Sequence, residues 1–177
     1  MSFPGISNTP TNPNLLPPNK FSLQVAALPE VQYWCQTVNI PGISIGEAIR
    51  STPFIDLFSP GDKAILGPLS ITFLVDEDLK SWSSLFNWMA QLTFIKSFDQ
   101  YKQLRKRPDV WVKPMPQFSD ISLSILNTKQ IPNIRIKFIN CFPTSLSDII
   151  VSTTSSPDDT ITSDATFRYD YYDIEMV

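Results

Sequence analysis

Between Pro68 and Leu92 the spacing of the apolar residues changes from that of a β-strand to that of an α-helix. Every second residue from 69 to 75 is apolar, which is the period of a strand with one buried face. After Asp76 the large apolar residues recur at steps of three and four, as on one side of a helix; they are Leu79, Trp82, Leu85, Phe86, Met89 and Leu92. The three acidic residues that begin at Asp76 suit a helix N-terminus, where negative charge and side-chain acceptors stabilise the first turn.

Alternating apolar residues predict further strands over 21–27, 31–40, 118–126, 131–140 and 161–177. The first two are expected to form a hairpin that turns at Leu28–Glu30. The runs SPGD (59–62) and NTKQ (127–130) are expected turns, and 141–149 is expected to form a short helical turn opened by Thr144 or Ser145. Together these patterns predict a mainly β domain with one strong helix.

Two segments beside this pattern are also distinctive. Residues 1–18 are rich in proline and asparagine and are expected to form an extended arm, ordered only against a neighbouring subunit or not at all. After the main helix, Phe94, Phe98, Tyr101 and Leu104 predict a second short helix, which includes part of a basic cluster at 102–107. On an acidic chain that cluster is better explained by a solvated surface or by ion pairs between subunits than by nucleic-acid binding.

Residues 42–67 have no clear period and carry more large apolar side chains than a loop needs. The candidates for contact with another subunit are Ile43, Ile45, Ile49, Phe54, Leu57 and Phe58. Two explanations remain open at this point. The segment either folds back as a further hairpin of its own domain, or it docks on another chain.

Composition narrows the classes of function. The 177 residues are 42% hydrophobic and 18% charged, which suits one globular domain with a core. The formal charge of −3 argues against a grip on nucleic acid through overall charge. Neither a membrane span nor a signal peptide is recognisable, so no membrane binding is expected and the chain is expected to fold in the cytoplasm.

Catalytic equipment is also missing from the sequence. Histidine is absent, which removes the commonest general base and metal ligand, and no glycine-rich phosphate loop or nucleophile motif occurs. Cys35 and Cys141 are expected to be buried free thiols, with a disulfide between them as the less favoured alternative in a reducing compartment. No catalytic residue, metal or cofactor is therefore predicted. A carbohydrate-binding β-domain that uses its four Trp residues remains the alternative from another class.

Five segments, in this order, carry a resemblance to a known family: NKFSLQV at 19–25, YWCQ leading to IPG at 40–42, VDEDLKSW with LFNWM at 75–89, INCFPTSLSDI at 139–149, and FRYDYYDIEMV at 167–177. The chain resembles, over about residues 19–177, the tail tube proteins of contractile-tailed phages of the T-even type. The resemblance implies a β-sandwich or half-barrel with one flanking helix. Neighbouring subunits would complete it into a β-barrel ring.

The function that the resemblance implies is structural. Six copies would form a ring, and rings would stack into a tube that conducts DNA to the host cell. The tape measure protein would lie inside, the sheath outside, and the baseplate hub and tail terminator proteins at the two ends. The tube would belong to the virion and assemble in the host cytoplasm. A single-ring initiator, adaptor or terminator of the same fold is the alternative. Candidate channel-lining residues are Ser122, Ser124, Thr166 and Asp170.

Overall fold

The computed structural model describes residues 14–28, 31, 34–93, 95, 117–154, 156 and 159–177. The elements in these ranges are β1 (Phe21–Val25), β2 (Cys35–Val38), β3 (Ile43–Ser51), β4 (Asp56–Leu66), β5 (Leu69–Leu74), α2 (Lys80–Thr93), β6 (Ser119–Leu126), β7 (Pro132–Leu146), β8 (Thr162–Arg168) and β9 (Tyr171–Met176). The predicted second helix, apart from residue 95, lies outside the described residues, as do the basic cluster and most of the N-terminal arm.

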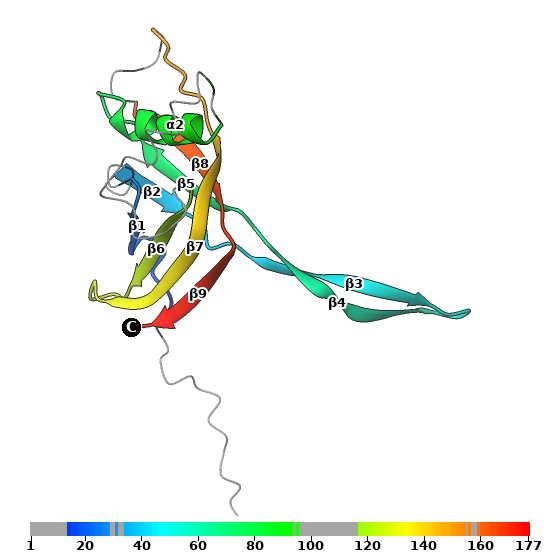
Figure 1. Cartoon of the computed structure of the whole chain (residues 1–177). Coiled ribbons are helices and arrows are strands. Elements are labelled where there is room, and N and C mark those ends of the chain that lie inside the picture. The colour runs from blue at the N-terminus through cyan, green and yellow to red at the C-terminus, as the bar shows by residue number, and fades with distance from the viewer. Residues whose placement is uncertain are drawn as a thin grey trace, which may run out of the picture.

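Seven strands form one antiparallel sheet in the order β1-β6-β7-β8-β5-β2, with β9 also paired to β7. Strand β7 belongs to both halves of this sheet, because Ile134–Ile139 pair with β9 and Phe142–Leu146 pair with β8. Between these parts Asn140 adopts a φ of 56°, and its backbone N–H donates to Asp120 Oδ1 at 3.2 Å. The register between β6 and β7 shifts at the same place. Such a bulge bends a strand, and the sheet curls into a half-barrel (Figure 1).

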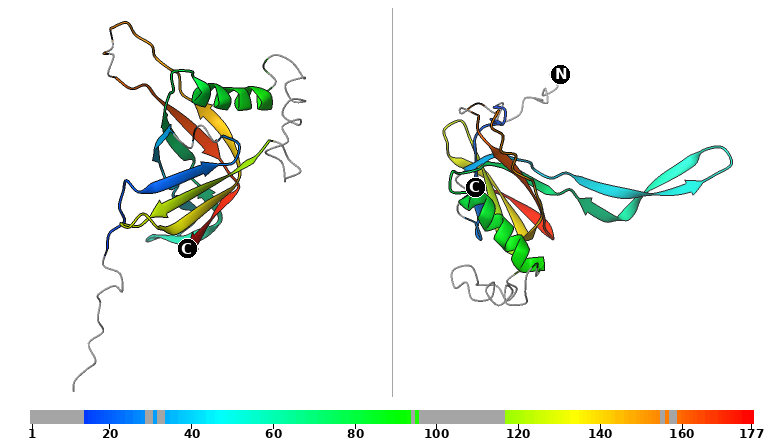
Figure 2. Two further views of the ribbon diagram at one scale, coloured as in Figure 1. Left: turned by 90° about the vertical axis from the view of Figure 1, so that its left-hand side faces the viewer. Right: turned by 90° about the horizontal axis from the view of Figure 1, so that it is seen from above.

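The core lies on the concave side of this sheet, with α2 across one end (Figures 1 and 2). Its largest fully buried side chains are Phe73, Phe138 and Phe167, each from a different strand. The predicted alternation is confirmed on β1, β5, β6 and the first half of β7, where the buried residues stand two positions apart; they include Leu23, Val25, Leu69, Ile71, Ile121, Leu123 and Ile136. The predicted fold class, mainly β with one flanking helix in an open half-barrel, is confirmed.

Strands β3 and β4 form a separate two-stranded antiparallel sheet. This β3–β4 hairpin, called the arm below, extends away from the half-barrel (Figure 1 and the right-hand view of Figure 2). Of the two explanations for 42–67, a further hairpin is therefore correct for the local structure. Its apolar side chains nevertheless do not pack on the domain.

Several predicted connections are wrong. Strands β1 and β2 do not form a hairpin, since β1 pairs with β6 and β2 pairs with β5. Residues 59–62 lie inside β4, whereas the NTKQ turn at 127–130 is confirmed. Residues 141–146 continue β7 instead of forming a helical turn, and the last segment is two strands, β8 and β9, with a break at Tyr169 and Asp170. Local residue preferences predicted these connections, but pairing with distant strands decided them.

The helix begins one residue after a tight turn that Asp76 stabilises. Leu79 has a φ of 54°, and the Asp76 carboxylate accepts hydrogen bonds from the backbone N–H groups of Lys80 and Ser81 at 3.0 and 2.9 Å and from the Ser81 hydroxyl at 2.6 Å. These bonds hold the pKa of Asp76 at about 2, below its usual range, with the Ser81 hydroxyl as the largest cause. The predicted capping role of the acidic run is confirmed for Asp76.

The buried stripe of α2 differs from the predicted one. Ser81, Leu85 and Trp88 face the core, whereas Leu79 and Phe86 are exposed. The small Ser81 lies against the Asp76 turn, and Trp88 contacts Phe167 with ring centroids 6.2 Å apart. Phe86 instead stacks on Trp82 at the helix surface, at 5.3 Å and 9°. Packing of Ser81 and Trp88 against the domain therefore sets the rotation of the helix.

Candidate functional site

The arm is the most exposed apolar part of the described chain. All nine residues of β3 are exposed. The six predicted contact residues all lie on the arm and are between 46% and 94% exposed: Ile43, Ile45, Ile49, Phe54, Leu57 and Phe58. The structure thus brings every one of them onto a single projecting element.

Cross-strand pairing arranges these side chains along the arm. Ile49 lies opposite Phe58 near the tip, and Ile43 lies opposite Leu66 near the base. Residues opposite each other in an antiparallel pair point to the same face and contact each other. Leu57, opposite Arg50, belongs to the neighbouring position along β4 and therefore to the other face. Both faces of the arm carry apolar side chains.

The middle of the arm has a register shift between Ile45 and Glu47. Here the two backbones come close. A Cβ atom added to Gly61 would lie only 2.7 Å from the Gly46 carbonyl oxygen. A side chain at Gly61 would force the strands apart. The PGD sequence, which predicted a turn, therefore forms an irregularity inside β4.

The tip is closed by hydrogen bonds across Thr52–Ile55. Thr52 N–H donates to the Ile55 carbonyl at 3.1 Å, and Ile55 N–H donates to Thr52 Oγ1 at 3.2 Å. The Ser51 hydroxyl donates to Asp56 Oδ1 at 2.7 Å. These bonds leave Phe54, at the tip, almost fully exposed. Backbone and hydroxyl groups thus close the tip, and the side chain of Phe54 projects into solvent.

The second candidate surface is the convex face of β1, β6, β7 and β9. The register aligns two cross-strand rows on it: Gln24, Ser122, Lys137 and Asp173 in one, and Ser22, Ser124, Arg135 and Glu175 in the other. Lys137 Nζ and Glu175 Oε1 are 2.8 Å apart in a half-exposed ion pair. The alternate residues of β1, β6 and β7 point to the core. This polar face carries two cations and two carboxylates among neutral side chains, and Lys137 and Glu175 form an ion pair on it.

The profile of the family described as phage tail tube protein matches residues 4–175. The chain belongs to this family. The resemblance drawn from its motifs is confirmed, and the protein is a tail-tube-type structural component of phages.

Individual relatives agree with this assignment. The tail tube terminator protein of Enterobacteria phage T4 is 31% identical over 144 residues, which are 79% of this chain and 76% of the T4 protein. The fold is similar to the cryo-EM structure of the anti-feeding prophage tube terminating cap, with a TM-score of 0.65, 14% identity and 99% and 100% of the two chains covered. A PVC sheath–tube complex matches with a TM-score of 0.60, 17% identity and coverage of 92% and 93%.

The predicted channel-lining residues of this tail tube protein lie in two places. Ser122 and Ser124 are neighbours on the polar face. Thr166 lies on β8 between Ser70 and Ser145, and Asp170 lies in the β8–β9 connection, where its Oδ2 accepts from Asn140 Nδ2 at 2.6 Å. The structure places the two serines beside Lys137 and Arg135, which were not among the predicted channel-lining residues. The sequence signal for these two residues was the alternation of Arg135 and Lys137 with apolar residues, which places both on the polar side of the strand.

Among the described residues, no group of three or more Cys, Asp or Glu could hold a metal ion, and no helix has the length and apolarity to span a membrane. Cys141 is buried and Cys35 partly buried, both as free thiols, and burial raises the pKa of Cys35 to about 11. Such a thiol is a poor nucleophile at neutral pH.

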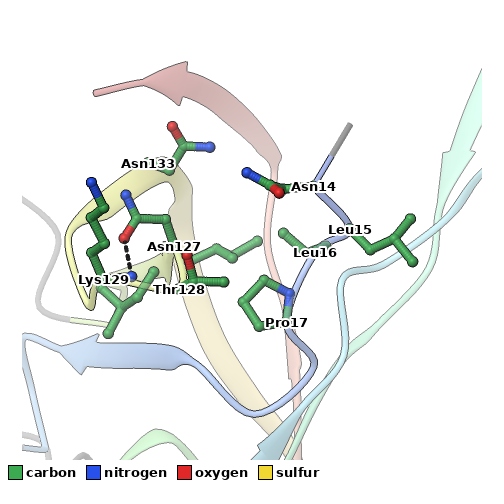
Figure 3. Close-up of a pocket in the computed structure, with 10 residues that line it drawn as sticks. Asn14, Leu15, Leu16, Pro17, Asn127, Thr128, Lys129 and Asn133 are labelled. Atoms are coloured by element: carbon green, nitrogen blue, oxygen red, sulfur yellow. Dashed lines mark hydrogen bonds between the residues drawn. The ribbon is translucent and has the colours of Figure 1, made fainter. Parts of the chain in front are cut away.

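One shallow pocket lies beside the N-terminal segment (Figure 3). Residues 14–17 line it together with the β6–β7 turn and Asn133. Asn127 Oδ1 in that turn accepts hydrogen bonds from the backbone N–H groups of Lys129 and Ile131 at 2.8 and 3.1 Å. Of the ten described residues that line the pocket, Lys129 alone is ionisable, so they include no acid–base pair. The pocket belongs to the turn structure, and the arm and the polar face remain the candidate sites.

Proposed function

We propose that this protein forms a terminating ring at the end of a phage tail tube. The observation that carries the proposal is the 31% identity to the T4 tail tube terminator over about three quarters of both chains. In this proposal six copies close into one ring, which stays as the last layer of the tube. The alternative is that the protein is the repeating subunit of the tube, and the fold shared with the PVC sheath–tube complex favours it.

The open edges of the half-barrel support ring formation. Among the described strands, β1 pairs only with β6, and β9 pairs only with β7. Because the pairs from β1 through β6 and β7 to β9 are all antiparallel, β9 of one copy can add antiparallel to β1 of the next. Edge strands carry backbone groups that need partners, and closure into a barrel removes such edges.

Exposed apolar side chains on β9 also support ring formation. Ile174 and Met176 lie on the core-facing side of the sheet, opposite Ile136 and Ile134 in register, but are 57% and 86% exposed. A neighbouring strand from a second copy would cover them and gain the free energy of burying apolar surface. This is the expected state of a strand whose partner belongs to another chain.

In the ring, the polar face would line the channel. Its cations are balanced by carboxylates, with Lys137 paired to Glu175. Contacts between lysine or arginine and phosphate dominate DNA affinity, so a charge-balanced wall would let DNA pass with little retention. DNA, and the tape measure protein during assembly, would occupy the channel; the sheath would surround the tube and the baseplate hub would lie at its far end. Assembly would occur in the host cytoplasm.

The arm would contact a neighbouring copy in the same or the next ring. A contiguous apolar surface on a projecting element is unusual for a monomer and marks an interface. Its six large side chains would be covered on assembly: Ile43, Ile45, Ile49, Phe54, Leu57 and Phe58.

Electron microscopy of the purified protein tests the proposal. Isolated rings with the polar face inside are expected for the terminator, and long hollow filaments would identify the repeating subunit. A protein that stays monomeric at high concentration, with and without tail components, would contradict both. The map also tests which sheet face lines the channel.

A matched pair of variants tests the arm in the same assay. Ile49→Ser with Phe58→Ser removes a cross-strand apolar pair, and the variant is expected to remain a folded monomer that no longer forms rings. The control, Ile150→Ser with Val151→Ser, removes two exposed apolar side chains from a loop of the domain and is expected to assemble. Normal assembly of the arm variant would show that the arm is not an interface.

A further inference from the structure

The base of the arm is attached to the domain by two tyrosines. The chain leaves the domain at Pro41 and returns at Gly67, and Gly67 N–H donates to the Gly42 carbonyl at 2.9 Å. The Tyr172 hydroxyl donates to the Pro41 carbonyl at 3.2 Å, and the Tyr169 hydroxyl donates to the Gly67 carbonyl at 2.8 Å. Each strand of the arm is therefore held by one phenol at the point where it meets the domain.

The two phenol rings are themselves fixed by the core. Both pack on Phe138, with ring centroids 5.1 Å from Tyr169 and 5.6 Å from Tyr172, and the two tyrosine rings are 5.9 Å apart. Phe138 is fully buried. Burial raises the pKa of Tyr169, which favours the protonated hydroxyl that donates to the arm. Rings packed in this way have little rotational freedom, and their hydroxyls are held toward the arm.

These tyrosines also belong to the edge of the sheet. Tyr172 is a residue of β9, and Tyr169 precedes it in the β8–β9 connection. That connection is fixed to β7 by the Asp170 N–H, which donates to the Ile139 carbonyl at 3.1 Å. Beside it, Arg168 Nη1 donates to the Leu66 carbonyl at 3.3 Å. The arm and the exposed edge strand β9 thus share one attachment.

We propose that Tyr169 and Tyr172 form a joint that keeps the arm ordered from its base, sets its direction and couples it to β9. A two-stranded hairpin has no core of its own, so its direction depends on the contacts at its base. With the joint intact, the arm and the β9 edge are presented in a fixed geometry to the next copy. The effect on assembly rests on the proposed function, whereas the effect on arm order does not.

The test is the double variant Tyr169→Phe with Tyr172→Phe, which keeps both rings on Phe138 and removes only the two hydroxyls. The control is Tyr171→Phe, because Tyr171 lies between them in sequence and is exposed. Hydrogen–deuterium exchange of residues 43–66, compared with that of the domain, measures arm order. Sedimentation and electron microscopy measure the concentration at which rings form.

Loss of two donors is expected to raise arm exchange about tenfold and the ring-forming concentration about tenfold, with domain exchange unchanged. The control is expected to match the wild type. Unchanged arm exchange would overturn the joint, and faster arm exchange with unchanged assembly would overturn its coupling to the interface. If the wild type forms no rings, the proposed function fails and arm exchange still decides the joint. The two single variants provide the same readout if the double variant unfolds.

Discussion

The half-barrel and the arm are both antiparallel β-structure rich in large apolar residues, but they use those residues in opposite ways. In the half-barrel, alternate side chains are removed from water, and Phe73, Phe138 and Phe167 are fully buried. In the arm, every residue of β3 is exposed. The arm is held by its backbone ladder, its closed tip and the attachment at its base. A β-pattern therefore predicts pairing, whereas burial depends on whether a second layer is present.

The largest expected difference between the two regions comes from one truncation made in each. Phe73→Ala is expected to lower the free energy of unfolding by about 3–5 kcal/mol, because it leaves a cavity in a packed core. Phe58→Ala removes the same atoms from an exposed position, and a change within about 0.5 kcal/mol is expected for the monomer. Urea unfolding at a concentration below assembly measures both. A large loss for Phe58→Ala would mean that the arm packs on its own domain in solution.

An intermediate effect on the free energy of unfolding is expected for α2. Two neighbouring residues of this helix, Leu85 and Phe86, differ in burial as the half-barrel and the arm do. Leu85→Ala is expected to cost about 2–5 kcal/mol, since Leu85 is fully buried against the sheet. Phe86→Ala loses a half-exposed stack on Trp82, for which about 0.5–1.5 kcal/mol is expected. Thermal unfolding of the two variants gives the comparison. Equal costs would place Phe86 in the core and would contradict the rotation of the helix described above.

The smallest expected effect on the free energy of unfolding concerns the Asp76 cap at the start of α2. This cap belongs to the domain, and the arm has no helix. Asp76→Ala is expected to cost about 0.5–2 kcal/mol at pH 7, as for the loss of a helix cap. The folded pKa of about 2 lies below the ordinary value of 3.8, so this contribution is present above about pH 4 and is lost as the pH falls toward 2. Unfolding of wild type and variant between pH 7 and pH 2 measures it.

The matching control is Asp78→Ala. Asp78 pairs with Lys80 at 2.5 Å on the exposed surface, and such pairs contribute about 0–1 kcal/mol. A cost for Asp76→Ala that does not shrink on acidification would show that the carboxylate of Asp76 is not the stabilising group.

Much of the half-barrel was predictable because its signals are local. Burial of Ile121 and Leu123, the NTKQ turn and the helix after Asp76 follow from periods and caps within a few residues. The six large apolar residues of the irregular segment are exposed on the arm, and their role in contacts with another subunit stays a prediction. The sequence did not predict that Ser122 and Ser124 share one face with Lys137, Arg135 and the carboxylates of β9, because pairing between distant strands aligns them; their role in lining a channel stays a prediction.

The order of residues was enough to establish the kind of element at most positions, the presence of one amphipathic helix and the family of the chain. Strand partners, the bend at Asn140, the rotation of α2 and the projection of the arm depended on contacts between residues far apart in the chain. The physical reason is the range of each interaction. Periodicity and capping act over one or two turns of chain, whereas register, curvature and helix rotation are set by which surfaces pack together once the chain has folded.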